Sequence, residues 1–169
     1  METMMVDAKP NCLHERVAAD LSDEKERNIF FEQVKNRGKN ILIVAEGLMG
    51  YLSEAEAAEF ATALYQIKKF KRWIIDLMSP GILPLIQQEM GTLLEDAGTP
   101  LKFAPAEGEL FFKPYGWNLI QSKSKLKTAA LLNRLSLEML TYATYPEPDG
   151  LRGNFPWSGV SLFENTGVD

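Results

Sequence analysis

The sequence has 169 residues, of which 46% are hydrophobic and 24% are charged, which fits one globular domain with a packed core. The net charge of -5 argues against a nucleic-acid partner, because phosphate backbones are bound by basic surfaces. A single cysteine and a single histidine exclude an internal disulfide and a multi-histidine metal site. No apolar run approaches the ~20 residues that span a bilayer.

The first ten residues are neither a basic nor a continuous apolar leader, so no signal peptide is expected. We therefore expect a cytoplasmic protein with no membrane partner. Residues 1–169 should form a single domain, with residues 1–12 disordered or poorly ordered.

Short apolar runs alternate with amphipathic stretches along the chain, which is typical of parallel α/β folds. Residues 16–20 predict a modest strand, followed by a helix with Ser22 as its N-cap and Gly38 at its end. Residues 41–45 are apolar at every position. Such a run predicts a strand covered on both faces, as in the centre of a parallel sheet.

The second half continues the same alternation. Ser53 and Glu56 form a capping-box pair that opens a helix. The later elements are expected at residues 73–78 (strand), 82–98 (helix), 117–121 (strand after a turn), 125–142 (leucine-rich helix) and 158–164 (strand). The short spacing of the last elements suggests that the final pair of strands is antiparallel.

Three expected strands finish at or near an acid, namely Asp20, Glu46 and Asp76. Ligands of open α/β sheets bind beyond the carboxyl ends of the strands, so these carboxylates favour a ligand that donates hydrogen bonds or carries positive charge. Asp20 has an equally good alternative role in capping the next helix, and Asp76 in pairing with a neighbouring helix. Glu46 stands at a sharp exit from a buried strand, where packing rarely needs a charge, which favours a functional role.

Residues 44–53, Val-Ala-Glu-Gly-Leu-Met-Gly-Tyr-Leu-Ser, closely resemble the signature of the leucine carboxyl methyltransferase family, which includes bacterial polyketide O-methyltransferases. Residues 17–23 resemble the strand that precedes this signature, and residues 108–117 resemble a late element that ends in Gly-Trp. The resemblance extends from residue 14 to residue 164. Gly50 departs from the family pattern, and its small side chain suggests a wider or looser turn.

The resemblance implies a class I methyltransferase fold, which is a Rossmann-like α/β sheet with helices on both faces, and the cofactor S-adenosylmethionine. Asp20 would accept a hydrogen bond from the adenine amino group. By the same match, the cofactor would contact Asp20, Leu21, Glu46 and Gly47, and the acceptor pocket would include Leu48 and Tyr51.

Family members also carry a Gly-rich loop and a ribose-binding acid upstream of the position of Asp20. Residues 1–13 are too short to hold the two strands and the helix that bear them. The resemblance therefore covers the C-terminal portion of a methyltransferase fold, N-terminally truncated, with the first strands missing.

Two functional hypotheses follow. In the first, the chain is an S-adenosylmethionine-dependent O-methyltransferase of a small-molecule acceptor, such as a carboxylate, or a fragment of one. Methyl transfer needs alignment and a dry pocket more than an acid or base, so we assign no catalytic residue and no metal ligand. In the second, the chain is a non-catalytic remnant or interaction module. The open edge of strand 41–45 would then favour association, for example as a homodimer.

Overall fold

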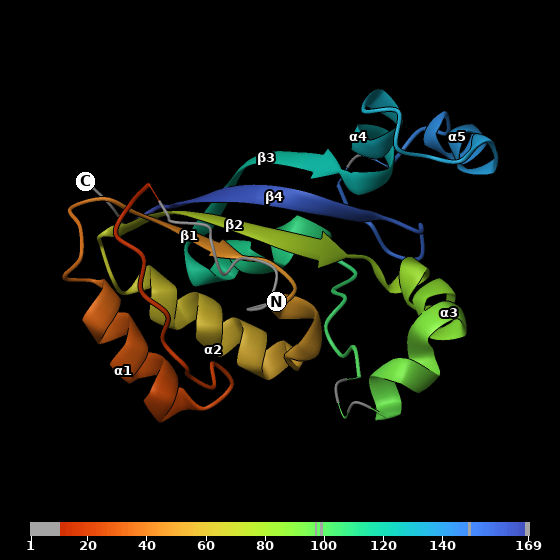
Figure 1. Cartoon of the computed structure of the whole chain (residues 1–169). Helices are drawn as coiled ribbons and strands as arrows, with labels where there is room; N and C mark the ends of the chain where they lie inside the picture. The colour runs from red at the N-terminus through yellow and green to blue at the C-terminus, as the bar shows by residue number, and fades with distance from the viewer. Residues whose placement is uncertain (1–10, 97, 99, 149, 168–169) are drawn as a thin grey trace.

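The computed structural model describes residues 11–167 apart from residues 97, 99 and 149. Within these residues one mixed sheet has the strand order β1-β2-β4-β3 (Figure 1). β1 and β2 pair in parallel, whereas β4 runs antiparallel to both β2 and β3. The strands are β1 (Ile41–Ala45), β2 (Phe70–Met78), β3 (Trp117–Ser124) and β4 (Ser158–Asn165).

This pairing makes β1, β2 and β3 end at one edge of the sheet, called here the carboxyl edge, where β4 begins. The antiparallel arrangement predicted for the last two strands is confirmed. β1 lies at the outside of the strand order and pairs only with β2 in the described part of the chain.

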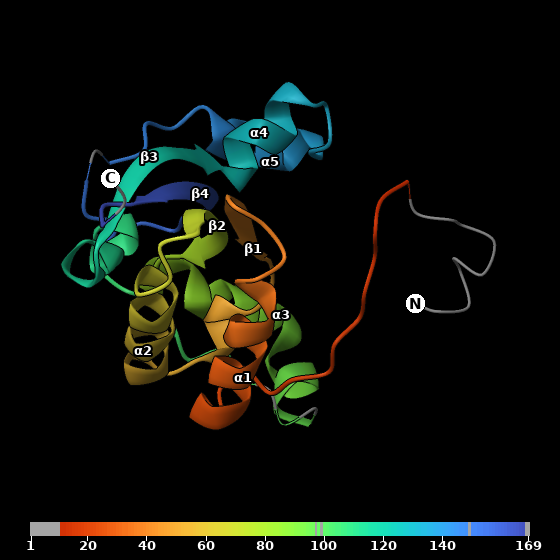
Figure 2. The same ribbon diagram turned by 90° about the vertical axis from the view of Figure 1, so that its left-hand side faces the viewer.

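Helices lie on both sides of the sheet. α1 and α2 pack under one face, whereas α4 and α5 lie beyond the end of β3 on the opposite side (Figures 1 and 2). None of the described helices is long and apolar enough to cross a membrane. The α-helices are α1 (Glu24–Val34), α2 (Glu54–Tyr65), α3 (Leu83–Asp96), α4 (Lys125–Leu131) and α5 (Leu137–Ala143), and the 3-10 helices are η2 (Met49–Tyr51), η3 (Pro80–Ile82) and η4 (Gly108–Tyr115).

An aromatic cluster forms the core between the sheet and α2. The Trp73 ring on β2 is fully buried, with ring centroids 5.9 Å from Phe60, 5.0 Å from Phe112 and 5.3 Å from Trp117. The indole Nε1 of Trp117 donates to the carbonyl of Ala61 at 2.9 Å, which ties β3 to α2. The contacts of Trp73 with Phe112 and Trp117 are edge-on, and such aromatic contacts add to the gain from area burial.

The opposite face of the sheet, called here the outer face, remains open. Leu42, Val44 and Val160 are 53%, 59% and 41% exposed. β1 is therefore an edge strand with one covered face, and not the doubly covered central strand that its apolar run predicts. The physical reason is that α1 and α2 pack only on the other side. By strand alternation and register, the outer face includes Leu42, Val44, Arg72, Ile74, Asp76, Val160, Leu162 and Glu164.

Helix starts follow local capping chemistry. At α2 both capping-box bonds are present, since Ser53 Oγ accepts from the Glu56 amide at 3.3 Å and Glu56 Oε2 accepts from the Ser53 amide at 2.6 Å. α1 begins one residue later than predicted, because Asp23 is the N-cap and accepts from the Glu26 amide at 2.9 Å.

Three elements differ from the sequence prediction. Residues 16–20 form no strand but an irregular and largely exposed arm, because no described strand lies beside them to share backbone hydrogen bonds. The helix expected over 125–142 is divided into α4 and α5 at Asn133, whose φ of 54° is left-handed. The turn expected before β3 is the 3-10 helix η4. The sequence predicts disorder for residues 1–12, and residues 1–10 of this segment lie outside the described residues.

Candidate functional site

The ends of β1 and β2 and the start of α4 meet at Asp76. Asp76 Oδ1 accepts from the Gly47 amide at 2.9 Å, and Oδ2 accepts from Lys125 Nζ at 3.1 Å. The Asp76 side chain is only 18% exposed, whereas that of Lys125 is 48% exposed. The sequence interpretation that Asp76 pairs with a neighbouring helix is confirmed, because Lys125 belongs to α4. Asp76 also binds the backbone of the loop that follows β1, at Gly47.

Glu46 and Gly47 form the exit from β1 at the carboxyl edge. Glu46 is exposed, and in the described part of the chain no hydrogen bond occupies its carboxylate. Gly47 has a φ of +63°, and nothing lies within 4 Å of the position that a Cβ would take. A ligand can therefore approach the Gly47 backbone closely, next to a carboxylate that is free to accept hydrogen bonds.

The two residues predicted for an acceptor pocket are Leu48, the N-cap of η2, and Tyr51, its last residue. Leu48 is half-buried and packs against the core, whereas Tyr51 is 38% exposed. Gly50 between them does not loosen the turn. A Cβ at Gly50 would lie 3.0 Å from Leu101 and 3.2 Å from Met78, and the Gly50 carbonyl accepts from the Lys102 amide at 2.7 Å. The glycine thus permits close packing, which contradicts the looser turn suggested by the sequence.

Asp20 lies at the start of α1 rather than at the end of a strand. Its Oδ1 accepts from the amide and the hydroxyl of Ser22 at 2.9 and 2.7 Å, and these hydrogen bonds hold the pKa of the Asp20 carboxyl below its ordinary value. The neighbouring Leu21 carbonyl accepts from buried Arg27 at 3.2 Å. No described hydrogen bond links Asp20 or Leu21 to Glu46 or Gly47.

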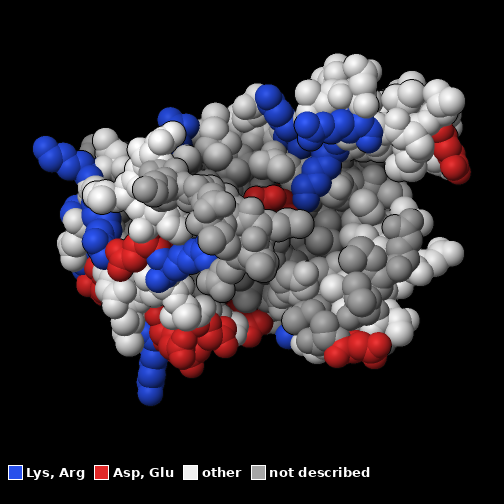
Figure 3. Space-filling model, viewed as in Figure 1, with Lys and Arg blue, Asp and Glu red and all other residues white. Residues whose placement is uncertain are grey.

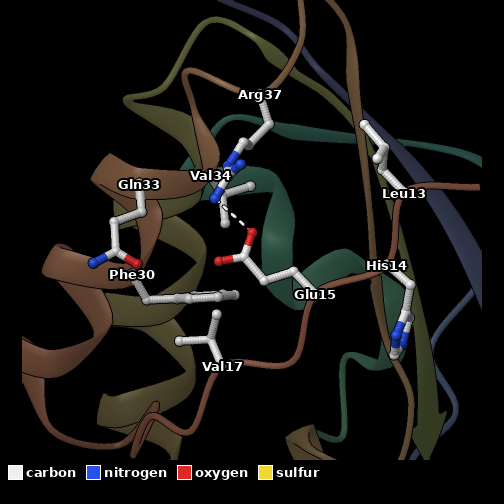
Figure 4. Close-up of a pocket in the computed structure, with 8 residues that line it drawn as sticks. All are labelled: Leu13, His14, Glu15, Val17, Phe30, Gln33, Val34 and Arg37. Atoms are coloured by element: carbon white, nitrogen blue, oxygen red, sulfur yellow. Dashed lines mark hydrogen bonds and ion pairs between the residues drawn. The ribbon is translucent and has the colours of Figure 1, made fainter.

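A hollow of about 490 Å³ lies between the arm of residues 13–17 and α1 (Figure 4). The Glu15 carboxylate and the Arg37 guanidinium meet across it at 2.5 Å. None of the residues predicted for the site lines it. It is lined by Leu13, His14, Glu15, Val17, Phe30, Gln33, Val34 and Arg37.

Among the residues that the structure describes, no three His, Cys, Asp or Glu side chains gather as a metal site. Lys125 is the residue at the carboxyl edge that sequence reasoning missed. Its contact with Asp76 spans 49 positions, and only the folded sheet brings the two together. The available signal was the run of lysines at the end of a predicted strand, at positions 123, 125 and 127.

The fold of the chain is similar to that of a solved structure, although no protein-family model and no curated protein sequence matches the chain. A methyltransferase of Anabaena variabilis that depends on S-adenosylmethionine aligns with 97% of this chain at a TM-score of 0.55 and 10% identity. Magnesium protoporphyrin IX methyltransferase of Synechocystis PCC 6803, solved with bound S-adenosylhomocysteine, aligns with 88% of the chain at a TM-score of 0.43 and 10% identity.

The Anabaena structure decides the fold class. The chain has the Rossmann-like α/β fold of a methyltransferase. It spans 63% of the length of the Anabaena protein and 50% of that of the Synechocystis protein. At this identity the likeness concerns the fold and not the residues of the site.

Proposed function

We propose that this chain is the C-terminal portion of an S-adenosylmethionine-dependent O-methyltransferase of the leucine carboxyl methyltransferase type, acting on a carboxylate of a small molecule. The observation that carries the proposal is the Gly47–Asp76–Lys125 network at the carboxyl edge of a methyltransferase-type sheet. This is the edge where open α/β sheets bind their ligands. The sequence match at residues 44–53 supports the same assignment.

The residues at this edge fit one side of the cofactor. Glu46 offers an unoccupied carboxylate to hydroxyl or amino groups, and Gly47 leaves room for close approach of its backbone. Asp20 fits less directly. Its carboxylate already accepts hydrogen bonds from Ser22 and would have to accept a further one from the adenine amino group. When bound, S-adenosylmethionine supplies an activated methyl group.

The chain's own contribution is to bind and orient the acceptor. Lys125 provides a positive charge next to the edge, which suits an acceptor that is already a carboxylate. Such an acceptor needs no general base, and the single histidine, His14, lines the hollow beside α1 rather than this edge. Positioning alone accounts for a large part of the rate in such displacements.

Replacement of Glu46 by alanine is expected to weaken S-adenosylmethionine binding by about ten-fold or more, because a hydrogen bond to a charged group is lost. Isothermal titration calorimetry measures the effect. Glu107→Ala is the matched control, since Glu107 is an exposed glutamate whose side chain makes no capping hydrogen bond. The proposal fails if the unaltered chain gives no binding heat at millimolar cofactor, or if both variants bind as it does.

The open edge of β1 favours a second candidate function, a module that associates through its sheet. Leu42 and Val44 are more than half exposed on a strand that pairs on one side only in the described residues, and such edges recruit further strands.

We expect a homodimer that Val44→Lys converts to a monomer, because a lysine on an edge strand opposes edge-to-edge pairing. Light scattering across a concentration series checks the mass. Leu85→Lys on α3, where Leu85 is 52% exposed, is the control and should leave the dimer intact. A monomeric unaltered protein contradicts this second function and leaves the first standing.

A further inference from the structure

The hairpin of α4 and α5 presents apolar side chains to solvent without a partner. Neither helix contains a buried residue, and Leu131 and Leu137 are 83% and 86% exposed. Six large apolar side chains are exposed within residues 131–142, and such a concentration on a folded protein is typical of a binding surface. The large apolar residues exposed on the hairpin are Leu131, Leu132, Leu137, Met139, Leu140 and Tyr142.

The base of the hairpin is strongly basic within an acidic chain. Residues 110–137 contain no aspartate or glutamate, although the whole sequence has a net charge of -5. In the space-filling view, Lys and Arg side chains gather where β3 passes into α4 (Figure 3). Lys125 is paired with Asp76, whereas no described hydrogen bond or ion pair engages the Lys123 ammonium, so this surface keeps positive charge that complements a single carboxylate. The basic residues of this stretch beside the hairpin are Lys123, Lys125, Lys127 and Arg134, whereas Lys113 lies on η4 before the start of β3.

Lys123 and Lys125 lie where the chain passes from the sheet to the hairpin, since Lys123 is in β3 and Lys125 is the first residue of α4. Lys125 reaches from α4 to Asp76 on the outer face, and Lys123 is the register partner of Val160. Val160 and Val44 on that face are 41% and 59% exposed. A ligand whose anionic group lies at Lys123 and Lys125 can thus cover apolar side chains of the sheet and of the hairpin.

We propose that this surface binds an amphipathic carboxylic acid, with the carboxylate at Lys123 and Lys125 and the apolar body along the hairpin and the outer face. The inference rests on the proposed function and names its acceptor class. A short polar acid would leave the exposed leucines uncovered, whereas an acyl chain removes them from water.

Calorimetric titration with dodecanoate, below its micelle-forming concentration, tests the proposal. We expect dodecanoate to bind at least about ten-fold more tightly than butanoate, because its longer chain buries more apolar surface. The double variant Leu131→Ser/Leu137→Ser should weaken dodecanoate binding by about ten-fold, since these exposed side chains would supply the apolar contact. Lys123→Ala/Lys125→Ala should weaken dodecanoate binding but not dodecanol binding.

The control variants are Leu85→Ser on α3 and Lys113→Ala on η4, which remove an exposed leucine and an exposed lysine elsewhere and should bind dodecanoate normally. Circular dichroism confirms that the hairpin variants remain folded. Equal dodecanoate binding by the double leucine variant overturns the proposal. So does co-sedimentation with phosphatidylglycerol vesicles without binding of free dodecanoate, which would instead assign the hairpin to a membrane surface.

A parallel titration with S-adenosylmethionine tests the proposed function separately from the proposed acceptor class. Cofactor binding without dodecanoate binding overturns the acceptor class and leaves the proposed function in place. Dodecanoate binding without cofactor binding overturns the proposed function itself.

Discussion

Replacement of Arg152 by alanine is expected to lower the free energy of unfolding by about 3–5 kcal/mol, because it leaves the buried carboxylate of Glu109 without its partner. Glu109 is 4% exposed, and its two oxygens accept from Arg152 at 2.9 and 3.2 Å. The Arg152 guanidinium also lies 4.2 Å from the centre of the Trp157 ring. Arg152 therefore fastens the loop before β4 to η4, and chemical denaturation monitored by circular dichroism measures the loss.

The control is Arg72→Ala, which removes an ion pair with Glu164 that is 3.9 Å long between side chains about half exposed. Exposed pairs of this kind contribute about 0–1 kcal/mol. A similar loss for both arginines would contradict the role assigned to the buried pair.

The pair of Glu109 and Arg152 should also affect how the free energy of unfolding depends on pH. Burial alone raises the pKa of Glu109, but hydrogen bonds from Arg152 and Ser122 outweigh it and hold the pKa below the ordinary value of 4.5. The stabilisation by ionised Glu109 is therefore present above pH 4.5 and is lost as the pH falls toward the folded-state pKa. Without Arg152, burial raises the pKa instead, so acid protonates the orphaned carboxyl. The stability difference between the variant and the unaltered protein should narrow in acid.

The sequence predicted well those elements that are determined by neighbouring residues in the chain. The capping pair of Ser53 and Glu56 gives the start of α2, and the apolar run over 41–45 gives β1 with its bounds. The fold class was also predicted, since alternation of strands and amphipathic stretches requires a sheet with packed helices. Elements that depend on distant partners were predicted less well. Residues 16–20 have the composition of a strand, but a strand forms only beside another strand.

The positions of the candidate site residues were predicted in the same partial way, and their roles stay predictions. Glu46 and Gly47 are found at the carboxyl edge, because a strand end follows from an apolar run and its glycine exit. Asp20 instead forms a turn with Ser22, whereas the side chain that caps α1 is that of Asp23. The link between Asp76 and Lys125 could not be predicted, because it depends on β4 inserting between β2 and β3.

Replacement of Trp73 by alanine is expected to destabilise the protein by about 3–5 kcal/mol, since a large buried side chain is exchanged for a cavity. Trp73 is fully buried at the centre of the sheet and its ring contacts Phe60, Phe112, Trp117 and Phe163. Its Nε1 is buried without a hydrogen-bond partner in the described structure, so the indole contributes through packing and not through its polar atom.

Trp73→Phe is the variant that separates these contributions. It keeps an aromatic ring in contact with α2 and η4 and removes the unpartnered N–H, whose burial costs about 1–3 kcal/mol. We therefore expect Trp73→Phe to lose much less stability than Trp73→Ala in the same denaturation experiment. Equal losses in the two variants would contradict this account, because the phenyl ring would then recover none of the packing. Because Trp73 joins β2 to both α2 and η4, the alanine variant should also lose near-ultraviolet circular dichroism, the signature of fixed aromatic packing.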